Sequence, residues 1–395
     1  MKIIKKLKYI PDFLKLVIAK ILGDILINTN KKYKDIWIIG ERKNEAKDNG
    51  YHLFKYIREN YPNDEVYYVI DKNSKDLEKI KDIGNVLYHD SIKHYIYYVM
   101  SSKLICAHLS SCVPDSPVCW KFHEKQVKNK KIAFIQHGII KETIKSVMYE
   151  NTKCDLFVCG AKPEYEFVKS EFGYPEGNVQ YLGLARFDNL HNRSEKKQIL
   201  VMPTWRQYIP SFTWNINNRD DAIKIFLESD YYKKFNRLIN SSNILKLLEK
   251  YDMTLIFYPH YEMQGYVELF KSKSEKVVIA KKDEYDVQEL LQESQILITD
   301  YSSVAFDFGY MRKPVIYYQF DEEKYYENHY KKGYYDYDVH GFGPKIKSEN
   351  DLIKSLDKIL KYGLNSKYKD RYDEFFPLYD TKNCKRHYDE IKNIC

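Results

Sequence analysis

The segment ILITDYSSVAFDFGYMRKPVIYY, from Ile296 to Tyr318, holds two short apolar runs separated by a polar turn and a helical stretch. The apolar runs Gln295–Thr299 and Pro314–Gln319 are predicted strands, and Val304–Tyr310 between them is a predicted helix. Continuous apolar strands of this kind are typical of parallel sheets covered by helices on both faces. The segment therefore predicts a β-α-β unit, the building block of a doubly wound α/β fold.

The same alternation continues in both directions along the chain. Tyr232–Lys250 and Asn350–Tyr362 are predicted helices, and the polar stretch HNRSEKK, from His191 to Lys197, separates two series of strands. The prediction is an α/β protein with two doubly wound, Rossmann-like domains, at residues 34–192 and 193–395. Its other predicted strands are Asp35–Gly40, Glu65–Ile70, Asn85–His89, Lys103–His108, Lys131–Gln136, Asp155–Cys159, Val179–Gly183, Gln198–Met202, Thr254–Tyr258 and Val277–Ala280.

Residues 1–33 form a third part with a composition of its own. From Met1 to Lys34 there are nine lysines and two aspartates, so 9 − 2 gives +7 of the chain's +8 net charge. No run reaches the about 18 uncharged apolar residues that span a bilayer, and no cleavage site of a signal peptide follows. We predict a basic amphipathic helix lying on an anionic membrane surface, peripheral and on the cytoplasmic face; a helix packed on the protein's own core is the alternative. Its apolar face would be Ile3, Ile4, Leu7, Ile10, Leu14, Val17, Ile18, Ile21, Leu22 and Ile25.

Composition and missing motifs exclude several functions. The body beyond this segment is almost neutral, which argues against nucleic acid as a partner. The seven cysteines include no C-x-x-C pair, which indicates reduced thiols in a cytosolic protein. No G-x-G-x-x-G, Walker loop, H-E-x-x-H or G-x-S-x-G occurs, and no strand-end loop carries Asp-x-Asp. We therefore predict chemistry without a metal or a cofactor.

Polar motifs follow several predicted strands, at the edge where open parallel sheets bind ligands. His137 and Gly138 stand directly behind a strand in IAFIQHGIIKE, and His260 does so in LIFYPHYE. A histidine there can accept a proton from a hydroxyl near neutral pH, and glycine allows a substrate to approach the backbone. A purely structural histidine is the alternative. YLGLARFDNL adds Arg186 and Asp188 near the same edge.

Two motifs of the second domain offer groups for an anionic ligand. After the strand that ends in Thr-Asp, the hydroxyls of Ser302 and Ser303 and free backbone N–H groups suit a diphosphate. Capping of the following helix is the alternative, and both roles are compatible. LVMPTWRQ places Thr204 and Arg206 behind another strand. Arginine suits a phosphate there, although a structural ion pair is an equally good explanation.

These motifs, in this order, resemble the CDP-glycerol glycerophosphotransferase family, which includes primases and polymerases of teichoic acid and some capsule synthesis. The similarity covers roughly residues 35–360, nearly the whole globular body. It implies a GT-B-like architecture, with the acceptor at the first domain and the CDP donor held mainly by the second. The similar segments are GERKNEAKDNGYHLFKYIRENYP (40–62), QHG (136–138), DLFVCGAKPEYEFVKSEFGY (155–174), GLARFDNL, PTWR and TDYSSVAFDFGYMRKP (299–314).

The resemblance also implies roles for single residues. His137 and His260 match the family's two functional histidines. Residues implied to line the donor site are Thr204, Arg206, Thr299, Asp300, Ser302, Ser303 and Asp307. Residues predicted for the acceptor or the cleft are Gly138, Lys141, Arg186 and Asp188.

The implied reaction transfers glycerol phosphate from CDP-glycerol to a hydroxyl of a lipid-linked polyprenyl-diphosphate saccharide or a growing polyol-phosphate polymer and releases CMP. Gln136, Ala185 and Tyr258 depart from the family pattern, which leaves CDP-ribitol open as the donor. A GT-B glycosyltransferase that uses a sugar nucleotide and a non-catalytic membrane scaffold are the further alternatives.

Overall fold

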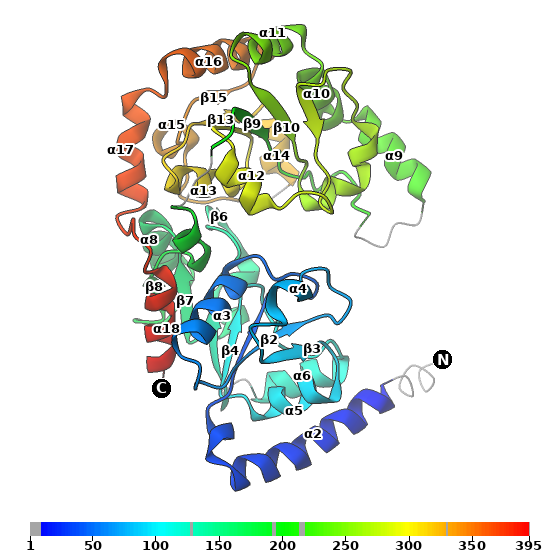
Figure 1. Cartoon of the computed structure of the whole chain (residues 1–395), viewed down its shortest axis with the longest axis vertical. Coiled ribbons are helices and arrows are strands. Elements are labelled where there is room, and N and C mark those ends of the chain that lie inside the picture. The colour runs from blue at the N-terminus through cyan, green and yellow to red at the C-terminus, as the bar shows by residue number, and fades with distance from the viewer. Residues whose placement is uncertain (1–8, 127–128, 192–194, 213–217, 329–330, 395) are drawn as a thin grey trace. The chain divides into compact units, whose positions relative to one another are not determined.

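The computed structural model describes residues 9–126, 129–191, 195–212, 218–328 and 331–394. The chain divides into two compact units, each built around a parallel sheet with helices on its faces (Figure 1). The first unit consists of residues 1–139, 145–189 and 380–395, and the second of residues 140–144 and 190–379. The predicted α/β class with two doubly wound halves is therefore confirmed.

The first unit contains a seven-stranded sheet in the order β3-β2-β1-β4-β5-β7-β8. Every strand of this sheet was predicted from its apolar run, and each ends one or two residues before the predicted end or at it. The order changes direction between β1 and β4, which is the position where doubly wound sheets bind ligands. The strands are β1 (Trp37–Gly40), β2 (Val66–Ile70), β3 (Val86–Tyr88), β4 (Lys103–Cys106), β5 (Lys131–Phe134), β7 (Leu156–Cys159) and β8 (Val179–Tyr181).

The second unit contains a six-stranded sheet in the order β11-β10-β9-β12-β13-β15, which changes direction between β9 and β12. Its strands are β9 (Gln198–Val201), β10 (Thr254–Phe257), β11 (Val277–Ile279), β12 (Ile296–Thr299), β13 (Val315–Tyr318) and β15 (Lys345–Ile346). The two-residue β15 was missed because so short a run has no recognisable pattern. A separate antiparallel pair joins β6 (Glu142–Thr143) to β14 (Lys331–Lys332).

Helices cover both sheets. In the first unit they are α2 (Ile10–Thr29), α3 (Asn49–Asn60), α4 (Leu77–Ile80), α5 (Ile92–Met100), α6 (Pro117–Gln126), α7 (Tyr149–Thr152), α8 (Lys162–Glu171) and α18 (Asn383–Asn393), with 3-10 turns η1 (Lys31–Lys34), η3 (Lys145–Val147) and η4 (Ala185–Asn189). In the second they are α9 (Arg219–Glu228), α10 (Asp230–Ile239), α11 (Ser242–Lys250), α12 (Val287–Glu293), α13 (Val304–Tyr310), α14 (Glu322–Asn328), α15 (Tyr337–His340), α16 (Glu349–Tyr362) and α17 (Ser366–Phe375), with η5 (Tyr261–Leu269). The single helix predicted over Tyr232–Lys250 is two helices: α10 ends at Ile239, and α11 begins at Ser242, with the cap residues Asn240 and Ser241 between them.

Helix α2 packs on α5 and α6 and presents its opposite side to solvent (Figure 1). Leu16, Ala19 and Gly23 are its buried residues. The exposed side is apolar, since each of its large side chains is at least 40% exposed: Ile10, Phe13, Leu14, Val17, Ile18, Ile21, Leu22 and Ile25. Ile3, Ile4 and Leu7 of the predicted face lie outside the described residues. No helix in the described part of the chain is long and apolar enough to cross a membrane.

The C-terminal helix α18 belongs to the first unit, whereas the sequence prediction extended the second domain to residue 395. Asp188 accounts for this return of the chain. Its carboxylate accepts hydrogen bonds from the backbone N–H groups of Asn383 and Cys384, both at 2.8 Å, and from Asn383 Nδ2 at 2.7 Å. The helix packs on α3 and η4. Asp188 thus anchors the start of α18, and its place at the acceptor or the cleft stays a prediction.

We expect Asp188→Ala to lower the free energy of unfolding by about 2 to 4 kcal/mol, because the donors at the start of α18 lose their charged acceptor. Urea denaturation measures the change. The control is Asp389→Ala, which removes only an exposed pair with Lys385 and should cost less than about 1 kcal/mol. Equal stability of the two variants would contradict the anchoring role.

Candidate functional site

The loop after β5 presents His137. The preceding residue, Gln136, has a left-handed backbone (φ 58°), and its side chain amide is held by Val158 O and the Glu164 carboxylate. Asn49 Nδ2 donates to the carbonyl of Gln136 at 2.8 Å, which ties the loop to the start of α3. The loop backbone is therefore fixed from two sides, while the His137 side chain itself is exposed.

Charged residues surround His137 within the first unit. Arg186 Nη1 donates to the carbonyl of His137 at 3.1 Å and to Asp48 Oδ1 at 2.9 Å. The surrounding protein, which displaces water, and the positive charges of Arg42 and Arg186 lower the pKa of His137, and Asp48 partly opposes this effect. A histidine with a lowered pKa is neutral near pH 7 and can accept a proton.

His108 lies against His137 and was not singled out from the sequence. Its ring stacks on that of His137 with 4.3 Å between centroids and 14° between planes. His108 follows β4, beside the position where the strand order of the first sheet changes direction. The sequence could have pointed to His108, because it is the last residue of the predicted strand Lys103–His108, and ligands bind at the ends of such strands.

In the second unit, Asp300 and Thr299 join the ends of β12 and β9. Asp300 Oδ1 accepts hydrogen bonds from the N–H groups of Thr204 at 2.8 Å and Tyr301 at 2.6 Å. Thr299 Oγ1 donates to Met202 O at 2.7 Å. Both side chains are fully buried. They hold the two loops beside the change of direction in this sheet, so their contacts are with the protein itself.

Arg206 is buried, and all three of its guanidinium nitrogens bind protein acceptors. Nε donates to Asp321 at 2.7 Å, and Nη2 donates to Asp300 at 2.8 Å and to Asp321 at 3.0 Å. Nη1 donates to the carbonyls of Thr204 at 2.7 Å and Trp205 at 3.4 Å. All three nitrogens thus bind protein acceptors, as the ion-pair alternative expects, and a role of Arg206 as a phosphate ligand stays a prediction.

Four predicted donor residues remain around this network. Thr204 Oγ1 is buried and has no hydrogen-bond partner among the described residues. Ser302 and Ser303 are half-buried, and within the described chain the Ser303 side chain makes no capping hydrogen bond to α13. Asp307 is buried in the first turn of α13. Ser302 Oγ accepts a hydrogen bond from the N–H of Val304 at 3.5 Å and can still donate its own proton. The hydroxyls of Thr204, Ser302 and Ser303 therefore have capacity for a ligand.

His260 follows β10, next to the same loops. Its backbone N–H donates to Pro203 O at 3.3 Å, and its Nδ1 accepts from the N–H of Glu262 at 3.2 Å. The Trp205 ring stacks on its imidazole at 6.5 Å between centroids. Because Nδ1 is an acceptor, the neutral ring carries its proton on Nε2. His260 can therefore donate a hydrogen bond through Nε2.

The two other residues predicted for the acceptor or the cleft differ from each other. Gly138 is buried in the loop of His137. Lys141 is buried, pairs with the Glu142 carboxylate and belongs to the second unit. A role of Lys141 at the acceptor or the cleft stays a prediction.

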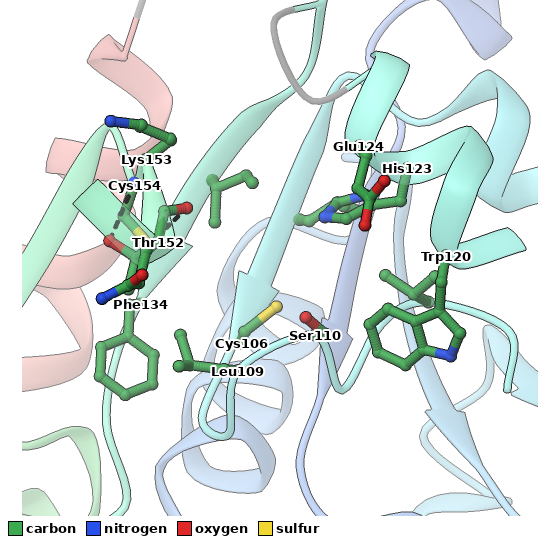
Figure 2. Close-up of a pocket in the computed structure, with 14 residues that line it drawn as sticks. Cys106, Leu109, Ser110, Trp120, His123, Glu124, Phe134, Thr152, Lys153 and Cys154 are labelled. Atoms are coloured by element: carbon green, nitrogen blue, oxygen red, sulfur yellow. Dashed lines mark hydrogen bonds between the residues drawn. The ribbon is translucent and has the colours of Figure 1, made fainter. Parts of the chain in front are cut away.

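A cavity of about 340 Å³ lies on the face of the first sheet (Figure 2). Alternating side chains of β4 and β5, among them Cys106 and Phe134, line it, and α6 contributes Trp120 and His123. Figure 2 shows Phe134 and Trp120 on opposite sides of the space. None of the predicted site residues lines this cavity, so the groups with suitable chemistry remain those at the strand ends.

Among the described residues, His89, Asp90 and His94 form one group of possible metal ligands, with ligand atoms within 4.8 Å of one another. Asp90 already binds Lys43 Nζ at 2.7 Å. The His94 ring bonds to the N–H of Asp90 at 3.2 Å and to Cys112 O at 3.1 Å. These contacts occupy Asp90 and both ring nitrogens of His94, which leaves only His89 Nδ1 without a hydrogen-bond partner among the described residues.

A family model described as CDP-glycerol:poly(glycerophosphate) glycerophosphotransferase matches residues 23–393, which include both strand-end histidines. The chain belongs to this glycerophosphotransferase family. Its relatives include the minor teichoic acid biosynthesis protein GgaB of Bacillus subtilis, 34% identical over 393 residues, and a teichoic acid poly(glycerol phosphate) polymerase of Bacillus spizizenii, 26% identical over 366 residues. The matched region covers 96% of this chain but 42% of GgaB, and 86% of this chain and 87% of the polymerase.

A solved structure of the wall teichoic acid polymerase TagF shares the fold. Its TM-score is 0.67 at 19% sequence identity, and the match covers 100% of this chain and 97% of TagF. This similarity confirms the predicted GT-B-like fold of the chain. The sequence motifs drew attention to His137 and His260, but not to His108, which stacks on His137, nor to Asn49 and Asp321, which hold the strand-end loops.

We expect Arg206→Met to lower the free energy of unfolding by about 3 to 5 kcal/mol, because Asp300 and Asp321 would stay buried without their counter-ion. The control is Arg237→Met, since the Arg237 side chain is exposed where it pairs with Glu349, and its loss should cost less than about 1 kcal/mol. Chemical denaturation compares the two. If Arg206→Met kept its stability and lost only donor affinity, Arg206 would be a ligand contact after all.

Proposed function

We propose that this glycerophosphotransferase transfers glycerol phosphate from CDP-glycerol to a hydroxyl of a lipid-linked or polymeric acceptor and releases CMP, in teichoic acid or capsular polymer synthesis. The observation that carries the proposal is the family match over residues 23–393, within which each unit places a histidine directly after a parallel strand. The relatives named for teichoic acid synthesis support the same reaction class.

In this mechanism His137 is the general base. The acceptor hydroxyl gives its proton to the neutral imidazole and its oxygen forms a bond to the β-phosphorus of the CDP donor. The bond between that phosphorus and the oxygen bridging to the α-phosphorus breaks, and CMP leaves with this oxygen. The lowered pKa of His137 supports this role, since the ring is unprotonated near neutral pH.

The second unit would hold the donor. His260 offers its Nε2 proton to the transferred phosphate or to the leaving group, and the hydroxyls of Ser302, Ser303 and Thr204 are suitable for the diphosphate. Arg206 and Asp300 act on this site by positioning its loops, because their polar atoms already bind protein partners. A metal has no role in this proposal.

CDP-ribitol is the alternative donor, and a sugar nucleotide would be the donor of a GT-B glycosyltransferase. The fold serves either reaction, so the by-product is decisive. Attack on phosphorus of a CDP-polyol releases CMP, whereas a sugar transferase typically releases a nucleoside diphosphate. A scaffold without activity would bind CDP-glycerol and turn over nothing.

We expect CMP release when the full chain is given CDP-glycerol and a lipid-linked acceptor, with lower rates from CDP-ribitol and none from sugar nucleotides. His137→Ala should lose about 100-fold or more in turnover while it still binds CDP-glycerol, because positioned proton transfer is removed. Chromatography of the nucleotides measures the rate, and His340→Ala, outside the proposed site, is the control. Release of a nucleoside diphosphate from a sugar donor would overturn the reaction, and normal turnover of His137→Ala would overturn the role of the base.

We also propose that the chain is a peripheral protein of the cytoplasmic membrane face, held by α2. Eight large apolar side chains on one side of the helix are exposed to water, which is energetically unfavourable. Their burial at the lipid boundary would stabilise the membrane-bound state. The lysines of the segment add attraction to anionic headgroups, about 1 kcal/mol each near the surface.

The membrane proposal is tested by Leu14→Ser, Ile18→Ser and Ile21→Ser combined, which spare the lysines and the buried residues of α2. We expect co-sedimentation with vesicles of acidic lipid to fall roughly tenfold or more, because apolar burial is lost. Salt should weaken binding of the natural chain, since lysine attraction is screened beyond about 10 Å at 0.1 M. Ile225→Ser with Val339→Ser, exposed apolar residues elsewhere, is the control. Unchanged binding of the α2 variant would place the anchor elsewhere.

A further inference from the structure

We propose that His108 is a positioning residue for His137: its uncharged ring stacks on the His137 imidazole, fixes the plane of that ring and shields one face of it from water. The inference deepens the proposed function, because it rests on His137 as the base, and it concerns a residue that is no part of the mechanism above.

The first observation is the geometry of the pair. The two ring centroids are 4.3 Å apart and the planes differ by 14°, so the rings overlap face to face. The backbone of His137 is held by Asn49 through Gln136 and by Arg186, and its imidazole makes one hydrogen bond to the backbone of Ala107. One hydrogen bond at the edge of a ring still allows the ring to tilt, and the stack on His108 opposes that tilt. A ring stacked on a second ring keeps one plane, and proton transfer depends on that alignment.

The second observation is the state of His108 itself. Both of its ring nitrogens are buried, and neither has a hydrogen-bond partner within the described ranges of the chain. Burial, together with His137 and Arg42 nearby, lowers the pKa of His108 to about 2. The ring is therefore neutral at physiological pH, and it cannot itself exchange a proton with the substrate there.

The third observation is the charge around His137. The charged groups that face it in this unit are Arg42, Arg186 and Asp48, and two of these three are positive. Removal of the His108 ring would admit water to the shielded face of His137. Hydration favours the imidazolium, so the pKa of His137 would rise toward its ordinary value and less of it would be neutral at pH 6 to 7.

Two substitutions separate the ring of His108 from its polarity. His108→Phe keeps an aromatic ring in the stack and removes both nitrogens, whereas His108→Asn keeps a polar group and removes the ring. His123→Asn makes the same chemical change in the same unit outside the stack, where His123 binds the Tyr98 hydroxyl, and serves as the control.

Histidine NMR of the full chain measures the pKa of His137 without any need for transferase activity. We expect His108→Asn to raise this pKa, and His108→Phe and His123→Asn to leave it near the natural value. In turnover, His108→Asn should lose about 10- to 100-fold in kcat with donor KM unchanged, because the base loses its alignment. The pH below which kcat of His108→Asn falls should also be higher than in the natural chain, since a base with a raised pKa is still protonated, and therefore inactive, at that pH.

Other results would contradict the stacking role, and each has a different meaning. If His108→Phe lost activity as His108→Asn does, the nitrogens would be required and the stacking role would be wrong. If His108→Asn left both the pKa and the profile unchanged, the pair would have no functional coupling. Should the variants fail to fold, ring-current shifts and cross-ring proton contacts in the natural chain decide, because an absent stack overturns the proposal. If the full chain released no CMP while the pKa of His137 changed as expected in NMR, only the proposed function would be overturned.

Discussion

The second unit depends on one buried guanidinium. Arg206 joins the loop after its own strand, β9, to Asp300 after β12 and Asp321 after β13. A charge removed from water destabilises a protein unless hydrogen bonds and opposite charge compensate it, so the three loops must keep the positions that satisfy Arg206. The rings of Tyr301 and Tyr325 lie over the guanidinium at 5.1 and 5.3 Å and exclude water from it. The polar groups suited to a ligand are held between these loops as a consequence.

The first unit supports its histidine in a different way. Asn49 uses its side chain as both donor and acceptor: it binds the carbonyl of Gln136 and the N–H of Arg186. Arg186 is in turn paired with Asp48, so the start of α3, the loop after β5 and the turn η4 form one network. Backbone groups are fixed by this network, while the side chain of His137 remains exposed and is restrained by the ring of His108. A rigid loop with an exposed reactive side chain is what positioned proton transfer requires.

Both ends of the described chain pack on the first unit. Asp188 holds α18 through backbone N–H groups, and a small residue, Gly23, allows α2 to lie close to Met100 of α5. The apolar side of α2 is exposed because α5 and α6 cover only the opposite side. One side of α2 therefore packs on α5 and α6, while the other side is apolar and exposed. From the sequence, packing on the protein and an outward apolar face were two alternatives for this helix.

Local sequence determined the strands, the parallel class and the strand-end positions of His137 and His260. A continuous apolar run, followed by a polar residue and a helix start, has its physical cause within about ten neighbouring residues and can be recognised there. Only the tertiary structure decided the partners of Arg206, Asp188 and His108. Arg206 and Asp321 are 115 residues apart, and Asp188 and Asn383 are 195 apart. Compensation of a buried charge is a requirement on position in space, and it leaves no periodic trace along the chain.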